Sequence, residues 1–134
     1  MRTLIILTLS LLVNLALNAQ SSQSKSESPF GSPKERAKLQ TEKMKSALSL
    51  REDQMDKIYT LNLKYAEIMQ KEVFDQGASQ WTMYTKGSEI NKRKEKELKP
   101  LLNEAQYKSY EKLKAETRKQ VMSKGMPSSL EDFK

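Results

Sequence analysis

The chain has 134 residues, of which 24 are Lys or Arg and 17 are Asp or Glu, so its formal net charge at pH 7 is +7. It contains no His and no Cys, which excludes imidazole bases, thiol nucleophiles, disulfides and zinc–thiolate sites. Its four glycines are scattered, so no glycine-rich phosphate-binding loop is expected. The composition therefore argues against an enzyme, and no cofactor or metal is predicted.

Residues 1–19 have the layout of a secretory signal peptide. Arg2 gives a positive start, an apolar run follows from Leu4 to Val13, and Ala19 is a small residue at the expected cleavage site. The run is too short for a typical bilayer span, although a retained membrane anchor is the alternative. This layout predicts cleavage near Ala19 and export from the cytoplasm. Because no Cys follows for lipid attachment, no stable membrane insertion of the mature chain is expected.

The next segment, residues 20–32, is rich in Ser and poor in apolar residues, which predicts a flexible arm. Ser32 is then placed to cap a helix, with Pro33 in its first turn and Glu35 three residues after the cap. From 33 to 122 the chain is rich in good helix formers, which predicts one all-α domain. Residues 123–134 are predicted to be a flexible C-terminal tail.

Four helices are predicted within this domain. Those at about 33–48 and 103–122 each carry a narrow apolar stripe. A third is predicted at about 80–99, before Pro100. Its apolar stripe consists only of Met83, Ile90 and Leu98, and the same face carries Gly87 and Lys94.

The remaining helix, at about 51–74, is apolar over more than half of its circumference. It is therefore either a central helix, covered on both sides, or a helix that leaves apolar surface exposed for association. Dimerisation around this helix is the expectation that follows. The acidic residues Glu52, Asp53 and Asp56 at its start complement the helix dipole and do not predict a metal site.

Basic side chains crowd the third helix and alternate with glutamates. An ion-paired, solvated face is the simplest interpretation, and a basic rim that attracts acidic or unfolded partners is the alternative. Aromatic and Met side chains lie close by, and Met adapts to many shapes. The hypothetical client-binding surface consists of Met69, Trp81, Met83, Tyr84, Lys92, Arg93, Lys94 and Lys96. Nucleic acid is not an expected partner, because an exported chain without a recognition motif gives no reason for it.

The stretches "LSLREDQ" (48–54) and "PLLNEAQ" (100–106) repeat one pattern 52 positions apart. In the second stretch Asn103 can cap a helix while Gln106 reaches back to the N–H of the cap, which is a capping box. In the first stretch Arg51 is a poor cap, and Ser49 with Glu52 offers an alternative helix start. The motif positions are Leu50, Gln54, Leu102, Asn103 and Gln106.

This paired pattern resembles the Leu-Thr-x-x-Gln motif of the Spy/CpxP family of periplasmic helical proteins, over about residues 33–122. The Thr of that motif is replaced here by Arg51 and Asn103. The resemblance implies a four-helix bent hairpin that dimerises into a cradle. It also implies an ATP-independent envelope chaperone or an adaptor that restrains a stress-sensing kinase. Metal-binding relatives are a poor guide, because this chain lacks His and Cys.

The expected function is therefore that of a periplasmic chaperone or envelope stress-response protein. Its expected partners are unfolded or partly folded proteins and a second copy of itself. Two alternatives remain: an adaptor for one sensor domain, and a basic protein that binds anionic lipid or polysaccharide of the envelope.

Overall fold

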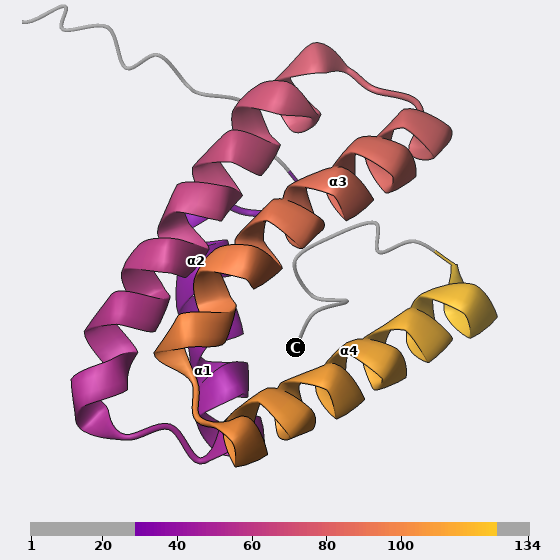
Figure 1. The fold of residues 1–134 in the computed structure, drawn as a ribbon. Helices are drawn as coiled ribbons and strands as arrows, with labels where there is room; N and C mark the ends of the chain where they lie inside the picture. Colours follow the sequence, from indigo (N-terminus) through magenta and orange to yellow (C-terminus); the bar gives the residue numbers. More distant parts are fainter. Residues whose placement is uncertain (1–28, 126–134) are drawn as a thin grey trace, which may run out of the picture.

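The computed structural model describes residues 29–125, which form four α-helices and two short 3₁₀ turns (Figure 1). No strand occurs in this part of the chain, so the predicted all-α class is confirmed. In chain order the elements are α1 (Pro33–Leu48), α2 (Glu52–Glu72), η1 (Phe74–Gln76), α3 (Gln80–Leu98), η2 (Lys99–Leu101) and α4 (Glu104–Lys124). The predicted signal peptide, most of the Ser-rich arm and residues 126–134 lie outside the described residues.

The predicted start of α1 is confirmed. Ser32 Oγ accepts a hydrogen bond from the Glu35 N–H at 3.2 Å, and Glu35 Oε2 accepts one from the Ser32 N–H at 2.7 Å. The helix ends at Leu48 and is followed by the C-cap residue Ser49, whose φ of 51° is left-handed. Ser49 therefore terminates α1, and the alternative in which it caps the following helix is wrong.

The ends of α2 and α4 differ slightly from the predicted ones. α2 ends at Glu72, because Val73 leaves the helical region and the chain continues into η1 and then into Gly77 with a φ of 59°. α4 continues to Lys124, two residues beyond the predicted end of the domain.

α2 is the central helix. It packs against α1 and against α3, while α4 packs mainly against α1. Figure 1 shows α4 leaving one end of this body at an angle. The alternative in which the broad apolar surface of α2 is covered on both sides is therefore the one observed. Within residues 29–125, the large apolar side chains that stay exposed are Trp81 and Tyr84 on α3 and Met122 on α4.

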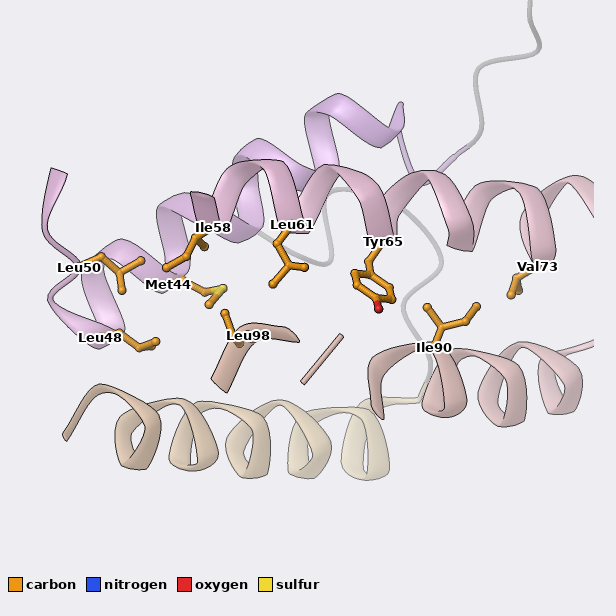
Figure 2. Close-up of a cluster of buried hydrophobic side chains, with 9 residues drawn as sticks. All are labelled: Met44, Leu48, Leu50, Ile58, Leu61, Tyr65, Val73, Ile90 and Leu98. Atoms are coloured by element: carbon orange, nitrogen blue, oxygen red, sulfur yellow. The ribbon is translucent and has the colours of Figure 1, made fainter. Parts of the chain in front are cut away.

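The core lies between α2 and its two neighbours (Figure 2). In Figure 2, Leu61 and Tyr65 point from α2 toward the side where Ile90 and Leu98 of α3 lie. The buried apolar cluster consists of Met44, Leu48, Leu50, Ile58, Leu61, Tyr65, Val73, Ile90 and Leu98. α4 adds only partly buried side chains to this cluster, so its first turns are held more firmly than its last ones. None of the helices in the described part is long and apolar enough to cross a bilayer.

Candidate functional site

The glutamines of the two motif copies meet inside the protein. Gln54 and Gln106 are each 6% exposed, although 52 residues separate them in the chain. Gln54 Nε2 donates to Gln106 Oε1 at 2.8 Å, and Gln106 Nε2 donates to Gln54 Oε1 at 2.9 Å. This reciprocal pair satisfies two buried amides without any charge.

Each glutamine also caps its own helix. Gln54 Oε1 accepts a hydrogen bond from the Arg51 N–H at 3.0 Å, and Gln106 Oε1 accepts one from the Asn103 N–H at 3.0 Å. The same oxygen therefore serves the helix start and the contact between the two repeats. A Glu side chain can fill the first role but has no N–H for the second.

Each glutamine further reaches the backbone of the other repeat. Gln54 Nε2 donates to the carbonyl of Leu101 at 2.9 Å, and Gln106 Nε2 lies 3.5 Å from the carbonyl of Ser49. Positions 49 and 101 differ by the same 52 residues as the two glutamines, so the contacts repeat about an approximate twofold axis. The repeated sequence thus forms one junction that ties the start of α2 to the start of α4.

The two copies differ at the cap. Asn103 Oδ1 accepts from the Gln106 N–H at 2.8 Å, which completes the predicted capping box of α4. Arg51 stands at the equivalent position of α2, but a guanidinium has no acceptor. Its Nε and Nη2 donate instead to Asp53, at 2.9 and 3.0 Å. The prediction that Arg51 is the poorer cap is therefore confirmed.

The leucines that precede the caps pack toward the core. Leu50 is buried, and Leu102 is partly buried against the same cluster. The motif residues are therefore brought together as one structural junction, with Asn103 on its exposed side.

The hydrophobic residues proposed for client binding fall into two environments. Trp81 is 74% exposed and Tyr84 is 45% exposed, and their rings stack with centroids 6.2 Å apart on the first turns of α3. Met83 instead packs against the core. Met69 also packs against the core, with its methyl group 3.6 Å from the point where a Cβ would stand on Gly87. Only the Trp81–Tyr84 pair is therefore presented to solvent.

Three of the four basic residues proposed for this surface are exposed. Lys92 and Lys96 lie on the solvent side of α3. Arg93 is exposed as well, and its Nη2 lies 3.2 Å from Glu72 Oε2 of α2. An exposed ion pair of this kind contributes little to stability, so Arg93 stays available to an acidic partner.

The expectation that Lys94 belongs to an exposed basic rim is wrong. The residue is 4% exposed, and its Nζ donates to Gln40 Oε1 of α1 at 2.8 Å. It follows Gly87 and Ile90 and precedes Leu98 on the buried face of α3, which is the face that the sequence periodicity assigned to it. Burial lowers the pKa of Lys94 to about 7.

Sequence reasoning missed the role of Arg36. Its guanidinium donates to the carbonyls of Gly31 at 2.6 Å and Ala66 at 3.1 Å, and to Gln70 Oε1 at 2.9 Å. It also lies over the ring of Phe74, 4.9 Å from the centroid. Arg36 thus ties the start of α1 to the end of α2. The sequence holds no signal for this, because the partners on α2 are the carbonyl of Ala66 and the side chain of Gln70, 30 and 34 residues along the chain.

A second apolar and basic surface lies near the end of α4. A shallow hollow of about 450 Å³ is lined there by Ala115, Arg118, Lys119, Met122 and Ser123. Met122 is 75% exposed. Within residues 29–125, no group of three Asp or Glu side chains is placed to hold a metal ion. These two surfaces expose aromatic rings, a thioether and positive charges, which are groups suited to non-covalent binding.

The fold and junction define a small all-α protein in which a repeated helix-start motif ties the start of α2 to the start of α4. Residues 19–110 match the family DUF4890, a domain of unknown function. The match spans more than half of the chain, so the protein belongs to this family. It includes α1 to α3, both motif copies and the first turns of α4. The matching family is not Spy/CpxP, and no curated protein or solved structure matches the chain.

Proposed function

We propose that the protein is an exported, ATP-independent chaperone that binds unfolded or partly folded proteins in the periplasm. The observation that supports this most directly is the exposed Trp81–Tyr84 pair on α3. Two large rings in water on a body that buries its other aromatic side chains more deeply are typical of an association site. Residues 1–19 support export through the signal-peptide pattern.

Positive charge complements these rings. Lys92 and Lys96 are exposed on the same helix, and Arg118 and Lys119 border the hollow on α4. Charges of one sign raise the rate at which oppositely charged segments arrive, while apolar contact retains them. A surface built this way discriminates little between sequences, which suits binding of many unfolded chains.

We further propose that the protein is related to the Spy/CpxP proteins. This relation is supported by the paired motif, by the four helices and by the signal-peptide pattern. On this basis the active form is a homodimer in the shape of a cradle, with the bent hairpin as its half.

The test is suppression of aggregation of a chemically unfolded model protein by the mature chain, without nucleotide. We expect suppression at near-stoichiometric ratios. Replacing Trp81 and Tyr84 together by Ala is expected to weaken it about tenfold, which corresponds to ~1.4 kcal/mol of lost contact. The matched control is the Gln80→Ala, Thr85→Ala double variant, which changes two exposed residues of the same helix that carry no ring.

The other outcomes separate the alternatives. No suppression together with saturable binding to one sensor domain favours the kinase adaptor. Retention on anionic vesicles that disappears at moderate salt favours a protein of the envelope surface. Equal activity of the ring variant and the control would show that Trp81 and Tyr84 do not bind clients.

A further inference from the structure

The layer between α1 and α3 contains an unusual polar group for a protein interior. Lys94 is 4% exposed, and the hydrogen bond that its ammonium donates goes to the neutral amide of Gln40 at 2.8 Å. A buried cation is costly unless it is paired with an anion, because hydration is lost and not replaced.

A second polar group, in the adjacent interface between α1 and α2, is also poorly satisfied. Asn62 of α2 is fully buried, and its Oδ1 accepts no hydrogen bond, while its Nδ2 donates to Thr41 Oγ1 at 2.8 Å. Thr41 is the neighbour of Gln40 on α1, so the two polar contacts reach adjacent residues of one helix from α2 and from α3. Water that enters between α1 and α3 would hydrate Lys94, and the Oδ1 of Asn62 is a further buried acceptor without a partner.

The link between α1 and α3 is weak in other respects. α1 packs mainly on α2 and α4, whereas α3 packs mainly on α2 and on the turn that follows it. The Lys94–Gln40 hydrogen bond thus spans two helices that are held chiefly through their common neighbour. Separating them locally does not require the α1–α2 packing to break.

The charged and titratable groups that face α3 from its neighbours have other partners. From α2, Lys64 and Tyr65 bond to Glu97, and Glu72 bonds to Arg93. From α4, Lys114 pairs with Glu95. From α1, the group that faces Lys94 is the uncharged Gln40. The low pKa of Lys94 accordingly has burial as its cause and no nearby charge.

We propose that Lys94 is an acid-sensitive latch between α1 and α3. When Lys94 is neutral, the amine stays in the interior and the two helices remain together. When it is protonated, the ammonium draws water into the layer, and α3 separates locally from α1. If the proposed chaperone function holds, this opening exposes further apolar surface to clients, so binding is stronger in acid.

The composition of the chain allows a pH-dependent transition to be assigned to Lys94. The chain has no His and no Cys, so the side chains that ordinarily titrate between about pH 5 and 8 are absent. The α-amino group at the start of the chain also titrates in this range. A transition near neutral pH that depends on residue 94 therefore identifies Lys94 as its source.

The test is hydrogen–deuterium exchange of the mature chain between about pH 5.5 and 8.5, corrected for the intrinsic pH dependence of exchange. Amides of residues 87–98 are expected to exchange at least about tenfold faster at the acid end, with a midpoint near neutrality. Lys94→Met should remain protected throughout. Lys92→Met, which changes an exposed neighbour, should keep the transition.

A second variant keeps the proposal testable if Lys94→Met does not fold. Gln40→Glu gives the ammonium a carboxylate partner, so the protonated form becomes stable inside and the transition should disappear. The proposal is overturned if the unmodified protein shows no change in exchange over this range, or if both Lys94→Met and Gln40→Glu keep the change.

A parallel measurement separates the latch from the chaperone. Suppression of aggregation is expected to be at least about threefold stronger at pH 6 than at pH 8, and to lose this dependence in Lys94→Met. If the helices separate in acid but aggregation is not suppressed at any pH, the latch is retained and the proposed chaperone function is rejected. If aggregation is suppressed but the helices do not separate, the chaperone function is retained and the latch is rejected.

Discussion

Gln54 and Gln106 occupy positions where capping alone would accept a glutamate. The sequence predicted that both residues follow a helix start, and the structure confirms it. It did not predict that the two side chains bond to each other, because a contact across 52 residues leaves no local pattern. The choice of Gln over Glu is explained by burial, since two facing carboxylates would repel each other in the interior.

Replacing Gln106 by Ala is expected to lower the free energy of unfolding by about 2–4 kcal/mol, because a cap is lost and the buried amide of Gln54 loses its partner. Urea denaturation measures this. Gln120→Ala, at an exposed position of the same helix, should change stability by less than ~0.5 kcal/mol. A double change of Gln54 and Gln106 to Leu should cost less than the sum of the single changes, since it removes both buried amides together. Strict additivity would contradict the pairing.

Lys94 gives a second prediction at this scale. Its pKa is about 7 in the folded protein, below its ordinary 10.5, so between these values the unfolded chain holds the extra proton. The free energy of unfolding should therefore rise with pH from about 7 to 10.5 and level off below 7. Lys94→Met should flatten this rise and stabilise the protein at pH 7 by about 1–3 kcal/mol. Chemical denaturation over this pH range decides it, with Lys96→Met as the exposed control.

At the scale of the elements, the helices were the part most open to prediction. Periodicity and caps placed every helix boundary within about two residues. The neighbours of each helix were harder to predict. The broad apolar face of α2 was compatible with both a central helix and a dimer interface. Its packing against α1 and α3 shows that α2 is the central helix of the chain. Lys94 was likewise placed on the buried face by periodicity, yet its charge pointed to the surface.

The unequal caps of α2 and α4 yield a prediction for these helices. Arg51→Asn should supply the missing acceptor and stabilise the protein by about 0.5–1 kcal/mol, because the exposed Arg51–Asp53 pair that it removes contributes little. Asn103→Ala should destabilise it by about 1 kcal/mol. Thermal unfolding measures both. Destabilisation by Arg51→Asn would show that Arg51 has a role beyond its position at the cap.

At the scale of the whole molecule, the body and the outer part of α4 differ in how they are held. The body consists of α1 to α3 and the first turns of α4. It is held together by the buried apolar cluster, by the hydrogen bonds between the two glutamines and by the contacts of Arg36 with α2. The family match ends at residue 110, and among residues 111–125, which the structure describes, only Leu113 and Val121 are even partly buried. Helix propensity alone does not predict this difference, because good helix formers occur along the whole of α4.

Removing residues 115–134 should therefore leave a folded body. We expect cooperative unfolding to persist and the free energy of unfolding to change by less than about 1 kcal/mol, because the deleted part of α4 buries little apolar surface. The Lys114–Glu95 pair and the partly buried Leu113 are retained by this boundary. The control is a chain that ends at Gly125, which keeps all of α4. If the shorter chain loses cooperative unfolding, the outer turns of α4 are part of the core in solution. If it stays folded but binds unfolded protein less well than the control, the hollow beside Met122 belongs to the binding surface.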